Sequence, residues 1–425
     1  MSESVKSKNR GLSLGTRKFL TNNVVTILFV LVGLGGLKVS GLSIPFFLDD
    51  IINRVARNGF MVLALIIPVL AGLGLNFAVV LGAMAGQTAI IMATHWGFGG
   101  IGGILLCVVL SFPFAYVMGL LTGKLLNKTR GKEMITTLIL GFFANGIYQL
   151  VYLILIGTII PMNNEVLVLS SGVGLRTTID LTDGLKFGLD NVVKIPLTLF
   201  SVLAGAAAAA GAVIQYLVRR RRPLGGKARL NWMVAGLVFG IASMVWGVYQ
   251  MLNQSMFSFL RVPAVTFAVI VLLCWFIHYF TKTKLGQDMR TVGQDSHVAD
   301  VAGIATDKIR VTAMIMSTVL AAWGQIIFLQ NMGTFSTYGS HENVGMFAIA
   351  SLLIGGASVA KATISQALIG TVLFHTMFIV SPLAGRVLFG DAQLGEFFRS
   401  FVAYGIIGLS LALHSWKKRM QGKLK

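Results

Sequence analysis

The chain has 425 residues, of which 55% are hydrophobic and 12% are charged, and it carries a formal net charge of +20. Because an ordinary soluble domain has about 25% charged residues, this composition excludes a string of soluble domains and indicates a membrane protein. The two cysteines, Cys107 and Cys274, lie inside apolar runs, which predicts small apolar packing residues and neither a disulfide nor a metal site.

Long apolar runs follow one another along the chain, and the charged residues lie outside their central parts. A helix needs about 20 apolar residues to cross the hydrocarbon core of a bilayer. The sequence therefore predicts an all-α fold, a polytopic transmembrane helical bundle of about 10–12 spans. The predicted spans are 22–40, 58–75, 76–95, 98–122, 134–160, 194–218, 230–252, 263–281, 309–331, 344–358, 363–383 and 397–414.

Two places predict interrupted helices. The spans 58–75 and 76–95 meet at Gly74-Leu75-Asn76 without a polar loop, which indicates a broken or re-entrant helix. The pair Gly355-Gly356 predicts a helix end or a re-entrant turn, because glycine adopts backbone conformations that end helices.

The side on which each loop lies is predicted from Lys and Arg, which concentrate in cytoplasmic loops. If residues 1–21 are inside and the spans alternate, the inner segments hold 26 basic and 6 acidic residues, and the outer segments hold 9 of each. The net charge then lies on one side of the membrane, which predicts that both termini are cytoplasmic and argues against nucleic-acid binding. The inner segments are 1–21, 123–133, 219–229, 282–310, the turn at Lys361, and 415–425.

The predicted organisation is a cytoplasmic tail at 1–21, one transmembrane domain at 22–414 and a basic cytoplasmic tail at 415–425. Within the domain, residues 161–193 mix Gly, Thr and Asp with apolar residues. This composition predicts a folded extracytoplasmic excursion.

The inner loop 282–308 has a helical pattern. Val298, Val301 and Ile304 recur every three residues, which favours a short amphipathic helix at the membrane surface. Such a helix is either interfacial only or a docking element for another protein. Its mixed charges and small residues favour docking.

Motifs of a membrane enzyme or an ATPase are absent from the sequence. The six His residues form no HExxH or i,i+4 ligand pair. The string nearest to a Walker A motif, Gly119-Leu-Leu-Thr-Gly123-Lys124, lacks one spacer residue and the final Ser or Thr. We therefore predict no catalytic residue, no metal and no cofactor.

Uncharged polar residues do lie within the predicted spans. A polar group in lipid must find a partner or face water, and interhelical hydrogen bonding is one interpretation of each such residue. As a set they indicate a water-filled path for a neutral, hydroxyl-rich solute, without a carboxylate that could couple transport to protons. The residues predicted to contribute to this path are Asn76, Gln87, Asn145 and Gln325.

Two strings carry a resemblance to a known family. The first, TKLGQDMRTVGQDSHVADVAGI, matches the family pattern at Thr283, Gly286, Arg290, Gly293, Asp295, Ala299, Gly303 and Ile304. The second is Ile354-Gly355-Gly356-Ala357-Ser358, after which the chain departs from the family at Ala360-Lys361-Ala362. Here the chain resembles the integral-membrane permease subunit of bacterial ABC importers, in the branch with ribose-type simple-sugar, nucleoside and branched-chain amino acid permeases.

The resemblance implies a machine with several chains. Two permease subunits, identical or homologous, would form the pore in the bacterial cytoplasmic (inner) membrane. Each would bind a cytoplasmic ATP-binding subunit through the 283–304 loop, and an extracytoplasmic solute-binding protein would deliver the solute. The residues that would form the ATPase-docking surface are Asp295, Val298, Ala299, Val301, Gly303 and Ile304.

The predicted function is thus ATP-driven import of a small polar solute, a simple sugar or a nucleoside. One alternative is the same machinery for another solute, such as a flavin-like vitamin or a branched-chain amino acid. A second alternative is a uniporter or secondary transporter that needs no ATPase subunit, and a membrane enzyme is the weakest.

Overall fold

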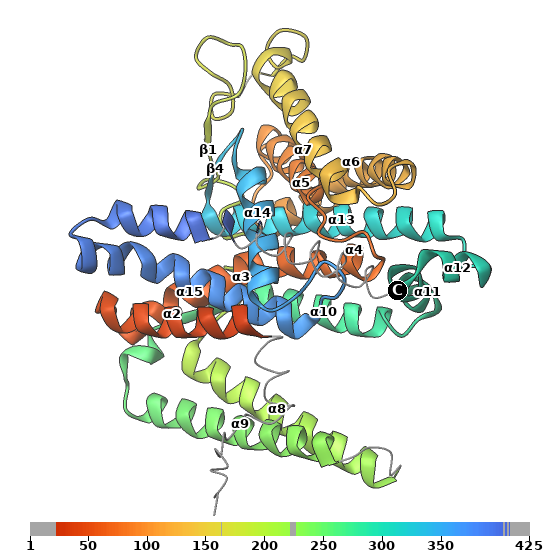
Figure 1. Ribbon diagram of the computed structural model, residues 1–425. Helices are drawn as coiled ribbons and strands as arrows, with labels where there is room; N and C mark the ends of the chain where they lie inside the picture. The colour runs from red at the N-terminus through yellow and green to blue at the C-terminus, as the bar shows by residue number, and fades with distance from the viewer. Residues whose placement is uncertain (1–22, 163, 222–226, 403, 406–407, 409–425) are drawn as a thin grey trace, which may run out of the picture.

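The computed structural model describes residues 23–162, 164–221, 227–402, 404–405 and 408, so both predicted terminal tails lie outside the described residues. Most of the long helices run side by side along one direction (Figure 1). The central bundle consists of α2 (Val24–Ser40), α3 (Ile44–Ala64), α4 (Ile66–Leu70), α5 (Val79–His95), α10 (Ala264–Phe280), α13 (Thr306–Met332), α14 (Ser340–Ile354) and α15 (Ile364–Phe389).

Three further groups of helices surround this bundle. Helix α6 (Gly100–Lys128) packs on α13 and α5, and α7 (Glu133–Leu150) continues into the π-helix η1 (Val151–Leu155). At one end of the bundle lie α11 (Lys284–Gln294) and α12 (Ser296–Val301) (Figure 1). The helices α8 (Leu197–Arg221) and α9 (Lys227–Leu252) form a hairpin, which a short 3-10 helix η2 (Met256–Ser258) follows.

The predicted all-α, polytopic class is confirmed. Seven helices of the described residues are long and apolar enough to cross a membrane, or eight if α10 and α11, bent by 75°, form one span. This number is below the predicted 10–12 partly because some helices are short. Helices α2 and α5 have 17 residues each and α14 has 15, so that each extends only about 22–26 Å at 1.5 Å per residue.

The span predicted at 58–75 was placed too late in the chain. Helix α3 begins at Ile44, and its first turns carry Asp49, Asp50, Arg54 and Arg57. Arg54 donates to Asp50 at 3.0 Å, one helical turn away. These charged residues lie outside the central part of the apolar run, but they belong to the same helix, because a charged, amphipathic helix end continues directly into that run.

The predicted helix interruptions are confirmed. Helix α4 ends at Leu70, Gly72 and Gly74 adopt positive φ angles of 73° and 72°, and α5 begins only at Val79. Helix α14 ends at Ile354, and the following Gly356 has a φ of 88°.

Two short strand pairs join distant segments. Strand β1 (Thr178–Asp180) pairs antiparallel with β4 (Thr334–Ser336), with the buried Ile179 opposite the buried Phe335. Strand β2 (Lys194–Pro196) pairs antiparallel with β3 (Arg261–Pro263). The first pair joins residues 178–180 of the predicted excursion to the strand that follows α13, and the extracytoplasmic location of the segment 161–193 stays a prediction.

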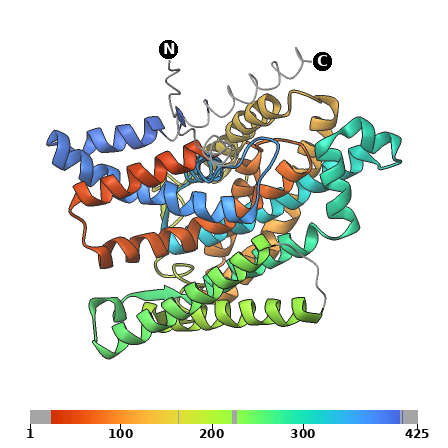
Figure 2. The same ribbon diagram turned by 60° about the horizontal axis from the view of Figure 1, so that its bottom comes forward.

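The α8–α9 hairpin is held together by small residues. A Cβ atom on Gly205 would lie 2.6 Å from the carbonyl oxygen of Gly240, so the two backbones touch. The hairpin joins the bundle at the β2–β3 pair, and the rest of it forms a separate layer (Figure 2).

Candidate functional site

The 283–304 loop is shaped by its own sequence. Thr283 caps α11 by accepting a hydrogen bond from the Gly286 amide at 3.3 Å. A side chain on Gly286 would lie 2.1 Å from the carbonyl oxygen of Phe280, so only glycine permits the sharp turn after α10. The loop forms two helices, α11 and α12, where the sequence pattern predicted one.

Helix α12 has a defined start and end. The Asp295 carboxylate accepts hydrogen bonds from the amides of His297 at 2.9 Å and Val298 at 3.2 Å. The helix ends at Val301, and Gly303 follows with a φ of 78°, a conformation that favours glycine. The predicted three-residue pattern therefore extends past the end of the helix.

The six predicted docking residues occupy different positions. Val298 and Val301 are 55% and 78% exposed and form the apolar surface of α12. Ala299 is fully buried in the core, and Ile304 is half-buried against it. Because Asp295 and Gly303 shape the two ends of the element, only the two valines offer a large apolar contact surface.

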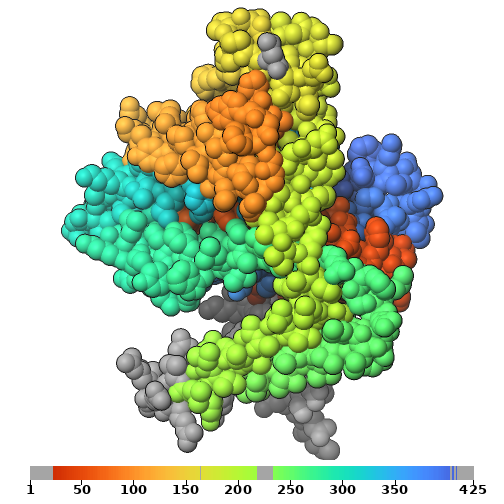
Figure 3. Space-filling model, turned by 180° about the vertical axis from the view of Figure 1, so that it is seen from behind, coloured from red at the N-terminus to blue at the C-terminus, as the bar shows by residue number. Residues whose placement is uncertain are grey.

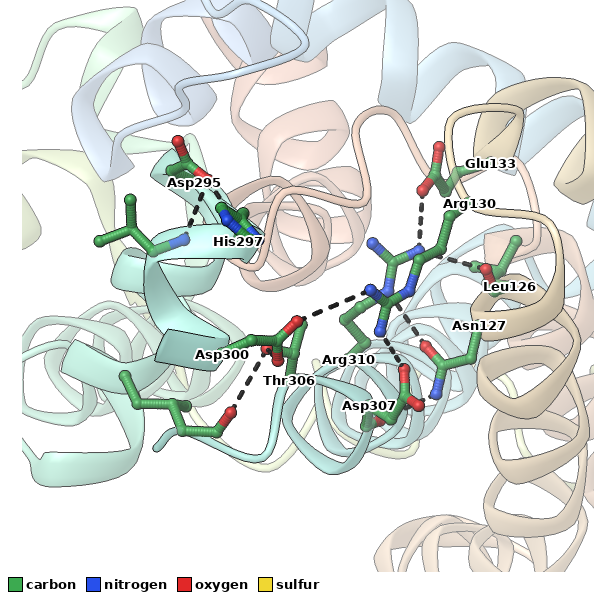
Figure 4. Close-up of polar contacts among 12 residues, drawn as sticks. Leu126, Asn127, Arg130, Glu133, Asp295, His297, Asp300, Thr306, Asp307 and Arg310 are labelled. Atoms are coloured by element: carbon green, nitrogen blue, oxygen red, sulfur yellow. Dashed lines mark hydrogen bonds and ion pairs between the residues drawn. The ribbon is translucent and has the colours of Figure 1, made fainter. Parts of the chain in front are cut away.

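Ionic contacts attach α13 to α7, as Figure 4 shows. Arg310 of α13 donates to Glu133 of α7 at 2.7 Å, and their side chains are only 6% and 15% exposed. The same guanidinium donates to the side-chain oxygen of Asn127 at 3.1 Å and to the carbonyl oxygen of Leu126 at 3.2 Å. This buried arginine therefore connects α13 with the end of α6 and the start of α7.

A second, exposed arginine reaches α12 (Figure 4). Arg130, between α6 and α7, pairs with Asp307 at 2.5 Å and with Asp300 of α12 at 3.9 Å. The hydrogen bond to Asp307 raises the pKa of the Arg130 guanidinium above its usual value. Asp300 also accepts a hydrogen bond from Thr306, the first residue of α13.

Backbone contact attaches α11 to the interruption between α4 and α5. A Cβ atom on Gly293 would lie 2.2 Å from the carbonyl oxygen of Leu70, and one on Gly72 would lie 2.7 Å from the Cα of Gly293. A Cβ atom on Gly74 would lie 2.9 Å from the Val359 side chain, beyond the end of α14. The α11 element, the α4–α5 interruption and the loop before α15 thus meet at one end of the bundle.

A polar cluster lies between α5, α7, η1 and α14. Gln87 donates to the carbonyl oxygens of Thr337 at 2.6 Å and Ser336 at 3.3 Å, and its own side-chain oxygen has no hydrogen-bond partner although it is buried. Asn145 lies 2.9 Å from His341, with which it shares a hydrogen bond, and it donates to Glu342.

Two tyrosines complete the polar cluster. The Tyr148 ring lies 4.4 Å from the Tyr152 ring and 4.8 Å from the His341 ring. The Tyr152 hydroxyl donates to Thr88 at 2.9 Å. The Tyr148 hydroxyl is buried and interacts with the Gln87 side chain, which connects Gln87 with the tyrosines of the cluster. Its Tyr, His and Glu members carried no sequence signal, because single polar residues in separate helices have no common spacing.

The other two predicted path residues lie elsewhere. Asn76 is buried in the α4–α5 interruption, where it accepts from the Ala78 amide at 3.0 Å and donates to Ser317 at 3.4 Å. Gln325 is fully buried on α13, and neither polar atom of its amide has a hydrogen-bond partner. The structure therefore brings Gln87 and Asn145 into one cluster and gives Asn76 a local structural role.

These features define a multi-pass membrane protein with a helical element at one end and a buried polar cluster between helices. Residues 166–407 match the family model described as the permease component of the branched-chain amino acid transport system. This match covers more than half of the chain, and the chain belongs to that family. No solved structure matches the chain.

Three curated relatives show the range of the family. The chain is 24% identical over 162 residues to the nucleoside ABC transporter permease NupC of Lactococcus lactis, covering 38% of this chain and 49% of the relative. It is 28% identical over 155 residues to the galactose/methyl galactoside import permease MglC of Treponema pallidum, covering 36% and 27%. It is 26% identical over 146 residues to the autoinducer 2 import permease LsrC of Escherichia coli, covering 34% and 36%. The matches therefore span half or less of the length of these relatives.

Proposed function

We propose that this chain is the permease subunit of an ATP-driven importer in the bacterial cytoplasmic membrane, and that its solute is a simple sugar or a nucleoside. The observation that carries the proposal is the α11–α12 element, which presents Val298 and Val301 at one end of the bundle. Its expected partners are a cytoplasmic ATP-binding subunit, a second permease subunit of the same or a homologous kind, and an extracytoplasmic solute-binding protein.

The contacts of this element support a coupling role. Gly293 of α11 touches the interruption that leads into α5, the helix of Gln87. Through Arg130 and Asp300, α12 reaches the connection that leads into α7, the helix of Asn145. A displacement of α11 and α12 by a closing ATPase would therefore act on both helices that hold the polar cluster.

The chemistry of the polar cluster supports a neutral, hydroxyl-rich solute. Gln87 and Asn145 provide amides, and Tyr148 and Tyr152 provide phenol groups and aromatic faces. Glu342 adds one carboxylate, which is bonded to Asn145. The names of the relatives cover nucleosides, galactosides and autoinducer 2, and such solutes suit this set of groups better than ions do.

The test combines cross-linking with transport. In a Cys274→Ser background, Val301→Cys should cross-link in native membranes to a protein that carries a Walker A motif, whereas Val173→Cys in the excursion should not. Proteoliposomes of the assembled complex should take up ribose, galactose or a nucleoside only when ATP and a solute-binding protein are present. Uptake by the permease alone would overturn the proposal and favour a uniporter or secondary transporter.

A further inference from the structure

A cavity of about 570 Å³ opens at the α11 end of the bundle, away from the polar cluster. Helices α4, α10 and α11 and the start of α15 form its walls. The six docking residues and the four solute-path residues named above do not line it, although Gly293, which touches the α4–α5 interruption, does.

The lining of this cavity combines cationic and apolar side chains. Arg290 and Lys361 contribute two permanent charges and His278 an imidazole, and none of the described residues that line the cavity is a carboxylate. These three side chains are exposed and form no ion pair within the described part of the chain. Ile66 and Ile277 belong to the apolar walls. The cavity thus presents unpaired cations beside a surface that favours hydrocarbon.

Exposed aromatic residues near the cavity indicate that it lies toward a membrane surface. Trp275 and Tyr279 stack on the outer face of α10 with ring centroids 5.8 Å apart, and both are more than 60% exposed. Exposed Trp and Tyr concentrate where a membrane meets water. His278, in the last turn of α10, and Thr281, which directly follows the helix, line the cavity.

The α8–α9 hairpin exposes apolar surface. It joins the bundle at the β2–β3 pair, and Figure 3 shows its far end standing apart from α10 and α11. The hairpin is apolar in this half, with Ile214 59% and Val238 60% exposed. Exposed apolar side chains of this kind favour contact with lipid chains.

We propose that this cavity binds the phosphate headgroup of an anionic phospholipid from the leaflet on the α11–α12 side. Arg290 and Lys361 bind the phosphate, and the acyl chains lie along the apolar wall of α4 and α10. Basic pockets between membrane helices bind such headgroups in this way. An acidic side chain of a protein partner would use the same cations, but it would leave the apolar wall uncovered, so the lining favours lipid.

The test compares two double variants with equal loss of charge. Lipid affinity of the purified full chain is measured by native mass spectrometry with phosphatidylglycerol and with phosphatidylcholine. The wild type should prefer phosphatidylglycerol, and Arg290→Gln/Lys361→Gln should bind it about thirty-fold more weakly, the factor expected for two basic residues near an anionic headgroup. The control Lys124→Gln/Lys308→Gln removes two exposed basic residues outside the cavity and should keep the preference.

Two further measurements make the proposal falsifiable even if the first variant is unstable. A photoreactive phosphatidylglycerol should label the wild-type chain at residues 277–294 or 360–364. Inorganic phosphate should not raise the thermal stability of the protein in phosphatidylcholine nanodiscs. The lipid site would be overturned if both double variants lost phosphatidylglycerol affinity equally, or if the photoreactive lipid labelled only residues outside these two segments. It would also be overturned if inorganic phosphate raised the thermal stability of the protein as much as phosphatidylglycerol does.

Discussion

The backbones of Gly72 and Gly293 touch, because a Cβ atom on Gly72 would lie 2.7 Å from the Cα of Gly293. This contact joins the proposed docking element directly to the interruption before α5. Contact between rigid backbones transmits a displacement without loss in flexible side chains. It is therefore the most direct route by which movement of α11 reaches the helix of Gln87.

Gly293→Ala tests this contact. The added methyl group would lie 2.2 Å from the carbonyl oxygen of Leu70, a backbone atom that cannot move alone. We expect a loss of about 1–3 kcal/mol in the free energy of unfolding, measured by SDS titration, together with reduced ATP-dependent uptake. The control Gly35→Ala adds a methyl group to an exposed helix face with no atom within 4 Å and should not destabilise the protein. Equal stability of both variants would contradict the contact.

Arg310→Gln tests the buried ion pair. It leaves Glu133 buried without its cation, which costs about 3–5 kcal/mol in comparable cases. Arg130→Gln removes an exposed pair instead, with side chains that are 43% and 63% exposed, and should cost at most about 1 kcal/mol. The double variant Arg310→Met/Glu133→Leu should regain most of the loss, because no buried charge remains. SDS titration of the four proteins checks this order, and a larger effect at Arg130 would contradict it.

The sequence predicted the helices and several local turns because their signals are local. Apolar runs located most spans, and glycines marked the interruptions at Gly74 and Gly355. The start of α3 could not be read in this way, since a charged amphipathic turn has the composition of a loop. The prediction placed Asp49 and Asp50 in such a loop, and the structure places them in the helix.

The candidate sites were predicted only in part, for a related reason. The polarity of Gln87 and Asn145 was visible, but their contacts, of Gln87 with Thr337 and of Asn145 with His341, depend on helix packing. Arg310 and Glu133 are 177 residues apart, and no periodicity links residues at such a separation. The three-residue pattern also counted Ala299 as part of a docking surface, although the fold buries it.

Membrane sidedness is a separate prediction from the charge distribution. In a Cys274→Ser background, Asp183→Cys and Val301→Cys should react with an impermeant maleimide from opposite sides of the membrane. Both positions are exposed, and the remaining Cys107 is buried. Asp183→Cys should label in intact spheroplasts, and Val301→Cys only after lysis. Labelling of both positions in intact spheroplasts would show that the predicted alternation is wrong.

Leucine substitutions at the predicted path residues separate transport from stability. Asn76→Leu removes two hydrogen bonds within a buried interruption and should lower the free energy of unfolding by about 1–3 kcal/mol. Gln325→Leu removes an amide that has no hydrogen-bond partner, so that stability should be kept or increased. If Gln325 contributes only to packing, uptake per assembled complex should also be unchanged.

The decisive variant of this series is Gln87→Leu. It removes hydrogen bonds to Thr337 and Ser336 and also the unpaired oxygen of the polar cluster. We expect uptake per assembled complex to fall more than tenfold. A solute that donates a hydrogen bond to this neutral oxygen loses that bond, because leucine has no acceptor. Gln87→Glu should retain more uptake than the leucine variant, because burial favours the protonated carboxylic acid, which keeps an acceptor oxygen and can still donate to the Thr337 carbonyl. Uptake per complex and SDS-titration stability are measured for both. Normal uptake with reduced stability in Gln87→Leu would assign Gln87 to helix packing and remove it from the solute path.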